Sequence, residues 1–293
     1  MNVAHKQLAE SNFEFNNEQT HWFSKLASMT LLVCGAFLSI VPFYWMLINS
    51  FKRNADIFAW PPLLTPTIWN WSNYEELFKS TKFIYNAGNS LMIAVLFTVL
   101  SVFLCSLAGF AFAKYREAPG AKFFFVLLLS PLMIPQQVLV IPLFILVNKL
   151  GWNNTYQAVF VPFAASAFGM FLLKQYIESI PDDLLEAARI DGCSEYRIFG
   201  QIILPLIKPA LAALAIIQFM YSWNDFLWPL IVLRTADRFT IPLILSQLQG
   251  EKYGIPYHLI MTGCTLATMP LVFVFLGLQK YFVAGATMGA IKQ

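Results

Sequence analysis

Long stretches of apolar residues with almost no charged side chain limit what this chain can fold into. Six of these stretches cover residues 26–50, 86–113, 123–148, 155–173, 209–233 and 258–279. A membrane-spanning helix needs about 20 mostly apolar residues. Only 12% of the chain is charged, against roughly 25% in a soluble domain. Lipid is the solvent that accepts such stretches, so we predict an all-α membrane protein with six transmembrane helices.

Two of the predicted spans contain features that would distort a straight helix. The second is expected to be entered by a turn at the membrane interface around Asn86–Ser90, where polar residues gather. The third carries Pro131, Pro135 and Pro142, and each proline frees a backbone carbonyl that a neighbouring helix or water must satisfy. We therefore expect the third span to be kinked.

Both ends of the chain are predicted to lie on one side of the membrane, because the number of spans is even. Residues 1–25 form a polar N-terminal tail that lacks the basic start and apolar core of a cleavable signal peptide, and residues 280–293 form a C-terminal tail. The short loop from Lys114 to Lys122 carries three basic residues, whereas the loop between the third and fourth spans carries Lys149 alone. Since basic residues favour the cytoplasmic side, we predict that both termini are cytoplasmic.

The segment 51–82 would lie on the opposite, outer side. It carries four basic residues of its own, which reduces the charge bias between the two sides. It also holds Trp60, Trp69, Trp71 and Tyr74, and such amphipathic rings favour the membrane–water interface. An interfacial anchor and a direct ligand contact both stay open for these rings.

Several classes of function have little support in the sequence. The net charge of +3 is spread between the apolar stretches, so no basic face for nucleic acid is expected. The four cysteines lack metal-ligand spacing, and the three histidines lie near chain ends or interfaces, so neither a metal site nor the catalytic site of an intramembrane enzyme is expected. A secondary transporter usually carries several charged residues at the midplane, but here Asp225 is the one carboxylate within a predicted span.

The stretch 174–208 is the one long loop on the predicted cytoplasmic side and is expected to form two short helices. Pro181 suits the first position of the first helix, and the two aspartates after it complement the helix dipole. Gly192 permits the left-handed turn that ends this helix, and Ser194 can cap the next one, which stops near Pro205. A charged helical hairpin with an apolar stripe on each arm has the shape of an element that inserts into a partner's groove.

Seven residues of this loop match the "EAA" signature of permease subunits of ATP-binding-cassette (ABC) importers. They are Glu186, Ala187, Ala188, Gly192, Ile202, Leu204 and Pro205. The chain therefore resembles that family, and its segments Tyr221–Pro229 and Gln279–Lys292 are similar to the second, smaller permease of maltose-type carbohydrate importers. The resemblance covers nearly the whole chain apart from the N-terminal tail. It implies a type I ABC importer permease fold in the cell inner membrane.

The resemblance also implies roles and partners. The segment Glu186–Gly192, with Asp191 in it, would form the coupling helix that docks in a cleft of the ATPase, supported by Ile202, Leu204 and Pro205. The implied partners are a second permease subunit in a heterodimer, two ATPase subunits, an extracytoplasmic solute-binding protein and the lipid bilayer. The chain has no G-x-x-x-x-G-K-[ST] motif. ATP and Mg²⁺ would therefore be bound by the partner ATPase, and no cofactor is expected on this chain.

The end of the chain has two interpretations. Gly285, Thr287, Gly289 and Lys292 belong to a tail with few bulky residues and little helix-forming power. Composition alone leaves a frayed terminus open, whereas the resemblance implies a tail that inserts between the two ATPase subunits.

Six residues at membrane depth are candidates for the translocation pathway or its gate. They are Asp225, Asn224, Trp223, Gln136, Gln137 and Asn89. An unpaired carboxylate in lipid is costly, so Asp225 should face the bundle interior or lie near the outer end of its helix. Two roles stay open for Asp225, a structural bond to another span and a contact with substrate or gate.

The substrate is less constrained than the fold. The resemblance implies a sugar or an oligosaccharide. No Lys or Arg lies inside a predicted span, so nothing in the chain requires an anion. A uronic-acid oligosaccharide or a glycerol-phosphate ester stays open as the alternative, because the second permease can hold the binding site.

Overall fold

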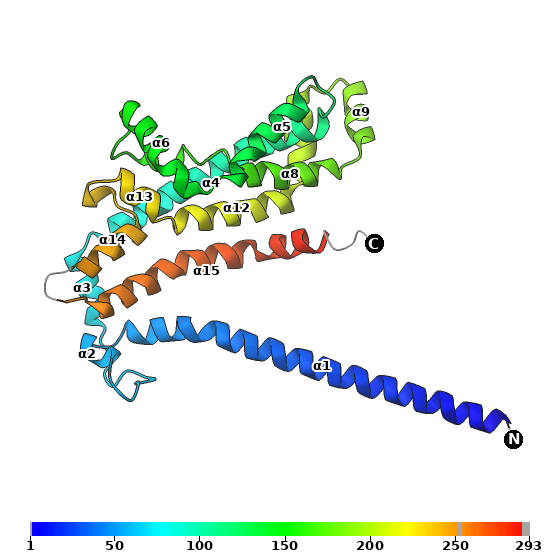
Figure 1. Ribbon diagram of the computed structural model, residues 1–293, viewed down its shortest axis with the longest axis horizontal. Helices are drawn as coiled ribbons and strands as arrows, with labels where there is room; N and C mark the ends of the chain where they lie inside the picture. Colours follow the sequence, from blue (N-terminus) through cyan, green and yellow to red (C-terminus); the bar gives the residue numbers. More distant parts are fainter. Residues whose placement is uncertain (1, 251–253, 289–293) are drawn as a thin grey trace.

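Helices are the regular elements of the part of the chain that the computed structural model describes, residues 2–250 and 254–288 (Figure 1). The longest are α1 (Asn2–Asn49), α4 (Phe83–Lys114), α12 (Lys208–Trp223) and α15 (Tyr257–Met288). The shorter α-helices are α2 (Asn54–Ile57), α3 (Ser72–Ser80), α5 (Ala121–Leu129), α6 (Gln136–Lys149), α7 (Tyr156–Phe160), α8 (Ala167–Glu178), α9 (Asp182–Ile190), α10 (Glu195–Ile198), α11 (Leu204–Leu206), α13 (Leu227–Val232) and α14 (Ile241–Gln247). Three 3₁₀ turns, η1 (Ser130–Met133), η3 (Ala236–Arg238) and η4 (Leu248–Gly250), and the π-helical segment η2 (Phe199–Ile203) complete the set. The predicted all-α fold class is confirmed.

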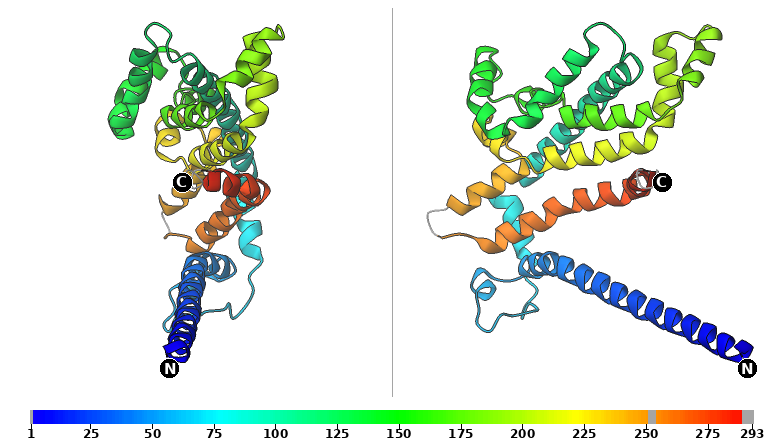
Figure 2. Two further views of the ribbon diagram at one scale, coloured as in Figure 1. Left: turned by 90° about the vertical axis from the view of Figure 1, so that its right-hand side faces the viewer. Right: turned by 45° about the vertical axis from the view of Figure 1, so that its right-hand side comes forward.

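Helix α4 forms the centre of the packing, with α8 and α12 lying along it (Figures 1 and 2). Side chains from these helices and from the segment 185–207 share a core in which Leu173 and Leu214 are fully enclosed. A second core around Phe219 joins α12 to α14 and α15. A third core around Trp228 joins α13 and α14 to α6 and α7. These three cores hold the helices together in one body.

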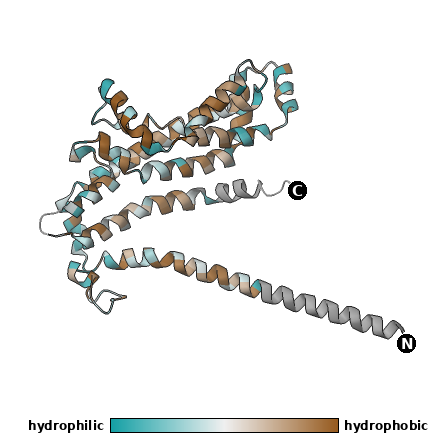
Figure 3. Cartoon of the chain, viewed as in Figure 1, coloured by the Kyte–Doolittle hydropathy of each residue, from teal (hydrophilic) through white to brown (hydrophobic). Residues whose placement is uncertain are grey.

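Helix α1 packs on α15 near its C-terminal end and otherwise projects away from the other helices (Figures 1 and 2). Between residues 26 and 47 most of its residues are apolar but not covered, and Leu31 and Phe37 are 76% and 70% exposed. Hydrophobic residues also run along α15, while α9 carries hydrophilic ones (Figure 3). Such a large apolar surface requires lipid or other subunits around it.

Within the described residues, three helices are long and apolar enough to cross a membrane alone. They are Lys25–Asn49 of α1, Phe83–Lys114 and Tyr257–Gly277 of α15. Two bent pairs also qualify if each pair counts as one span, Ala121–Met133 with Gln136–Lys149, and Glu195–Leu206 with Lys208–Trp223. The chain is therefore a multi-pass membrane protein.

The second predicted span has no interfacial turn at its start, so that prediction was wrong. Asn86 and Ser90 lie inside α4, which is one continuous helix. The Nδ2 atom of Asn86 donates to the carbonyl oxygens of Ala236 and Phe239, at 2.9 Å each. The Oγ of Ser90 accepts from the first backbone N–H of α14 at 2.8 Å. The polar residues that suggested a turn instead bind α4 to the segment before α14.

The third predicted span is bent more sharply than a kink. α5 gives way to the 3₁₀ turn η1, which contains Pro131, and α6 begins directly after Pro135. The two helical parts meet at 106°. Pro142 is accommodated inside α6, so the break lies where two prolines follow each other within five residues.

The fourth and fifth predicted spans each contain two helices and a break. In 155–173, α8 begins after Ser166, whose Oγ accepts from the N–H of Gly169 at 3.1 Å and caps the new helix. In 209–233, the segment Asn224–Phe226 separates α12 from α13. Apolar composition predicted these stretches, but the caps inside them decided where the helices begin and end.

Helix α9 lies at the same end of the molecule as the start of α1 and the last turns of α15 (Figure 1). The predicted tail boundaries do not interrupt these helices. α1 is helical from Asn2, and α15 continues past residue 279 to Met288. An established helix extends by one residue at little cost, so weak helix formers can follow a long apolar helix.

At Gly109, α4 and α8 approach so closely that a side chain would not fit. A Cβ atom there would lie 3.1 Å from the Cβ of Leu173 and 3.1 Å from the backbone nitrogen of Lys174. A backbone atom cannot move aside unless the two helices separate. The glycine therefore sets the distance between the two helices.

Replacing Gly109 by Ala should lower the Tm of the purified protein, because overpacking a core costs about 1–3 kcal/mol. Gly88 on the same helix is the matched control, since nothing lies within 4 Å of its Cβ position. Gly88→Ala should leave stability unchanged or raise it by up to about 1 kcal/mol through helix propensity. Thermal unfolding in detergent, followed by tryptophan fluorescence, compares the two variants. Equal Tm values would contradict the close α4–α8 contact.

Candidate functional site

The predicted helical hairpin is present as α9, a tight turn and α10, and we call residues 180–199 the coupling hairpin. Gly192 has a φ of +80°, which places it in the left-handed region. The N–H of Cys193 donates to the carbonyl of Ala188 at 2.9 Å, and the N–H of Gly192 donates to the carbonyl of Arg189 at 3.0 Å. These two bonds form a Schellman motif, in which a glycine ends the helix. The predicted helix end at Gly192 is confirmed.

The inner face of the coupling hairpin is buried on the ends of the long helices. Leu185 of α9 and Ile198 of α10 are 1% and 0% exposed. They belong to the same core as Phe110 of α4, Ile177 of α8 and Leu214 of α12. The hairpin is therefore fixed to three helices of the membrane-embedded body and cannot move without them.

Charged groups tie the coupling hairpin at two places. Lys114 Nζ lies 2.6 Å from Asp182 Oδ1, and Arg189 Nε lies 2.7 Å from Glu195 Oε1. The hydrogen bond from Lys114 holds the pKa of Asp182 below its ordinary value. Hydrogen bonds from Arg189 and Tyr115 do the same for the pKa of Glu195. Both carboxylates stabilise the fold above their unfolded pKa, and this contribution is lost as the pH falls through the lowered values.

The outer face of the hairpin is open. Glu186, Ala187 and Asp191 are exposed, and Ile190 and Tyr196 are 86% and 88% exposed. The signature residues therefore divide: Ala188 is buried against the body, while its neighbours point outward. Exposed apolar side chains rimmed by polar ones mark a surface for contact with another protein.

Ile202, Leu204 and Pro205 follow the hairpin where the π-helical η2 gives way to α11, a change that the sequence did not predict. Ile202 and Leu204 pack against the core below the hairpin, whereas Pro205 is exposed. Proline has no N–H to donate to the carbonyl of Gln201, four residues earlier. The π-helical η2 ends directly before Leu204, so the register changes where an α-helical bond cannot form.

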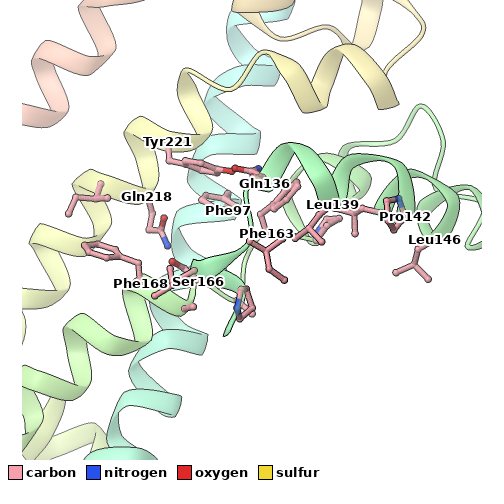
Figure 4. A pocket seen from close by; sticks show the side chains of 18 residues that line it. Phe97, Gln136, Leu139, Pro142, Leu146, Phe163, Ser166, Phe168, Gln218 and Tyr221 are labelled. Carbon is pink, nitrogen blue, oxygen red and sulfur yellow. The ribbon is translucent and has the colours of Figure 1, made fainter. Parts of the chain in front are cut away.

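A groove of about 640 Å³ lies between α6, α8 and α12, beside α4 (Figure 4). Its lining is mostly apolar, with Gln136, Ser166, Gln218 and Tyr221 as polar members. Gln136 Nε2 donates to the hydroxyl of Tyr221 at 2.6 Å. The Tyr221 ring stacks on Phe97 of α4 with 5.7 Å between centroids. An apolar groove with a few convergent polar groups is the usual form of a small-molecule site.

A second cavity of about 430 Å³ shares Gln136, Phe163 and Tyr221 with this groove. Four of the predicted pathway residues line it: Gln136, Gln137, Asn224 and Asp225. Asp225 lies in the break between α12 and α13, and its Oδ1 accepts from the N–H of Trp228 at 3.4 Å. The break thus brings a carboxylate and three amides together from two distant parts of the sequence.

Trp223 and Asn89 do not line this cavity or the groove. Trp223 is buried, donates through Nε1 to the carbonyl of Ala267 at 3.1 Å and stacks on Phe219. Asn89 Nδ2 donates to the carbonyls of Asp237 and Phe239. These contacts join α12 to α15 and α4 to the segment before α14.

The sequence analysis missed Gln218, Tyr221 and Phe97. Gln218 and Tyr221 stand seven and four residues before Asp225, which is the spacing of one helix face. That periodicity was available in the sequence. Phe97 had no such signal, because it is one of 28 phenylalanines, and only the packing of α4 on α12 selects it.

The predicted docking tail is partly outside the described residues. Gly285 and Thr287 belong to the last turns of α15, whereas Gly289 and Lys292 lie outside the residues that the structure describes. In the described part of the chain no three His, Cys, Asp or Glu side chains gather as metal ligands would.

Comparisons with known proteins agree on one family. Residues 106–287 match the family described as binding-protein-dependent transport system inner membrane component. The chain is 39% identical over 260 residues to the arabinooligosaccharides transport system permease protein AraQ of Halalkalibacterium halodurans, which covers 88% of this chain and 92% of that protein. It is 36% identical over 267 residues to the lactose transport system permease protein LacG of Rhizobium radiobacter, with 91% and 96% covered.

The fold has a solved counterpart. A crystal structure of a bacterial ABC transporter involved in the import of the acidic polysaccharide alginate contains a chain that aligns with a TM-score of 0.77. The alignment covers 88% of this chain and 95% of that chain, at 22% identity. The likeness extends over nearly all of both chains and supports the type I importer permease fold.

Replacing Gly192 by Ala should destabilise the coupling hairpin by about 1 kcal/mol, because a Cβ in the left-handed region is strained. The strain is purely a backbone effect, since nothing lies within 4 Å of the Cβ position. Gly200, which also has open space around it and lacks a positive φ, is the matched control. Limited proteolysis of the hairpin should be faster in Gly192→Ala and unchanged in Gly200→Ala. Equal cleavage rates would contradict a role for the left-handed turn.

Proposed function

The chain belongs to the family of binding-protein-dependent transport system inner membrane components, and from this premise we propose that it is a permease subunit of an ABC importer for a sugar or an oligosaccharide. With a second permease it forms the translocation pathway, and two ATPase subunits and an extracytoplasmic binding protein complete the complex. The observation that carries this proposal is the coupling hairpin, which is buried on one face and open on the other. The two relatives of the chain named above are transport permeases.

The coupling hairpin is the proposed contact with the ATPase. Glu186, Ala187 and Asp191 lie on its open face, and Ile190 and Tyr196 offer apolar surface beside them. The Schellman turn and the two ion pairs make the hairpin stiff. A stiff element that is anchored in the core of the spans transmits a displacement instead of absorbing it.

The pathway residues that we propose are those that line the groove and the cavity beside it. Gln136, Gln137, Asn224 and Asp225 offer amide and carboxylate groups that can exchange hydrogen bonds with hydroxyl groups. Tyr221 and Phe97 add aromatic rings. Amides and a carboxylate beside aromatic rings suit a sugar, whose ring has polar edges and apolar faces.

The named substrates of the relatives point the same way. The two relatives transport arabinooligosaccharides and lactose by name. None of the residues that line the groove or the cavity is Lys or Arg, so these two hollows offer an anionic substrate no counter-charge. We therefore favour a neutral sugar. The anionic alternative, a uronic-acid oligosaccharide or a glycerol-phosphate ester, would require the second permease to supply the cations.

The proposed topology places the hairpin and both termini in the cytoplasm. The last turns of α15 lie at the same end of the molecule as α9 (Figure 2). This position is needed if the C-terminal tail is to contact the same ATPase subunits as the hairpin. Gly285, Thr287, Gly289 and Lys292 are proposed to extend toward the junction of the two ATPase subunits.

The complex reconstituted in proteoliposomes with its partner subunits should hydrolyse ATP faster in the presence of the binding protein and its sugar. The chain alone should show no hydrolysis, because it lacks the phosphate-binding loop. Arabinotriose, lactose, glycerol 3-phosphate and a uronic-acid trisaccharide are tested in parallel. Stimulation by one of the two neutral sugars supports the proposal. Stimulation by an anion alone would show that the substrate is an anion. Hydrolysis by the isolated chain would refute the assignment of ATP hydrolysis to the partner subunits.

Replacing Asp225 by Asn should reduce uptake while the complex still assembles, because the amide keeps the shape but not the charge of the carboxylate. Glu117→Gln is the matched control, since Glu117 is a highly exposed carboxylate in the loop between α4 and α5. Size-exclusion chromatography measures assembly, and uptake into proteoliposomes measures transport. Loss of the assembled complex in Asp225→Asn would favour a structural role, and full uptake would remove Asp225 from the pathway.

A further inference from the structure

Two adjacent residues at the end of α4 hold both arms of the coupling hairpin. Lys114 is the last residue of α4, and Tyr115 follows it. Because the chain leaves the helix at Tyr115, the two side chains take different directions and can reach different partners. Here one side chain binds the start of α9, and the other binds the junction of α9 and α10.

Lys114 fixes the first arm. Its side chain is only 3% exposed. Its Nζ donates to the carbonyl of Ile180 at 2.5 Å and to Asp182 Oδ1 at 2.6 Å. Ile180 lies in the link between α8 and α9, and Asp182 is the first residue of α9. Bonds from a cation are stronger than neutral ones, so this contact holds α9 against the end of α4.

Tyr115 fixes the second arm. Its hydroxyl interacts with the carboxylate of Glu195 and with the guanidinium of Arg189. Arg189 and Glu195 are themselves an ion pair that joins the end of α9 to the start of α10. The Tyr115 ring stands edge-on to Phe110 of α4, with 5.9 Å between centroids. The hydroxyl is thereby directed at the closed end of the hairpin.

The same helix reaches the groove. Phe97 lies about 26 Å from Lys114 along α4, at 1.5 Å per residue. Its ring stacks on Tyr221, and one turn further along α4 Ser101 Oγ accepts from Gln218 Nε2 at 2.6 Å. Helix α4 therefore contacts the hairpin at one end and two groove residues of α12 toward the other.

We propose that Lys114 and Tyr115 form a non-covalent clamp that passes displacement of the docked coupling hairpin to α4 and, through α4, to the groove. Both act as positioning residues. This inference rests on the proposed function, because it assumes that the hairpin docks on an ATPase. The covalent chain joins the hairpin to α8 and α12, and apolar packing seats its inner face on α4, α8 and α12. The clamp adds directional polar bonds between both arms of the hairpin and the end of α4.

The test uses two cysteine reporters in the full complex, with the native Cys34, Cys105, Cys193 and Cys264 replaced by Ser. Tyr196→Cys reports on docking, because Tyr196 is 88% exposed on the hairpin in this chain alone. Leu146→Cys reports on the groove, which Leu146 lines. Maleimide labelling rates are compared before and after trapping with ATP and vanadate. The clamp variant is Lys114→Met with Tyr115→Phe, Lys114→Arg is the conservative variant, and Lys122→Met is the control for loss of a loop charge.

With an intact clamp, the docked hairpin should be shielded and trapping should change labelling of the groove. In the clamp variant the hairpin should stay shielded while the groove response falls by about threefold or more, within the range of coupling energies between distant sites. Lys114→Arg should restore part of the response, and Lys122→Met should leave it intact.

Three outcomes would overturn the inference. A full groove response in the clamp variant shows that α4 does not need the clamp. If the clamp variant loses both the shielding of Tyr196→Cys and the groove response, the pair only holds the shape of the hairpin. The same conclusion follows if neither the double variant nor Tyr115→Phe assembles. A hairpin that is unshielded in the intact complex refutes docking itself, and therefore the proposed function as well.

Discussion

The interior of a bilayer offers no water to backbone groups, and the rest of this structure depends on that constraint. Each N–H and C=O at membrane depth must find a partner within the protein, and a helix satisfies most of these groups within its own segment. Where helices break, side chains bind the backbone groups that are left without a helical partner. Ser166 caps α8 at the break after α7, and Asp225 accepts the N–H of Trp228 at the start of α13. The interruptions in the apolar stretches are therefore stabilised sites.

The same constraint explains how polar side chains are used inside the body. Asn86, Asn89 and Ser90 bind backbone groups of the segment before α14, so one polar cluster on α4 organises a connection about 150 residues away in the chain. A buried amide that is left without a partner is expensive. Satisfying it between α4 and the segment before α14 fixes their relative position more strictly than apolar contacts do, since a hydrogen bond depends on direction and the hydrophobic effect does not.

The coupling hairpin follows ordinary aqueous rules because it lies beyond the apolar stretches. Its helices are short, and short helices need caps and tertiary contacts to form. Gly192 supplies the turn, Leu185 and Ile198 supply the anchor, and the ion pairs close the two ends. The result is an element that remains ordered while one of its faces stays open for a partner.

The sequence by itself determined the membrane class, the all-α fold and the position of the hairpin, because hydropathy, helix stop signals and the spacing of the loop signature are local properties. It also marked Gln136, Gln137, Asn224 and Asp225 as polar residues at depth. Only the tertiary structure decided that these four line one cavity while Trp223 and Asn89 bind elsewhere. The breaks in the apolar stretches and the meeting of Lys114 and Tyr115 with the hairpin were likewise decided there. Such groupings depend on which helix faces which, and that choice is made by packing between residues far apart in the chain.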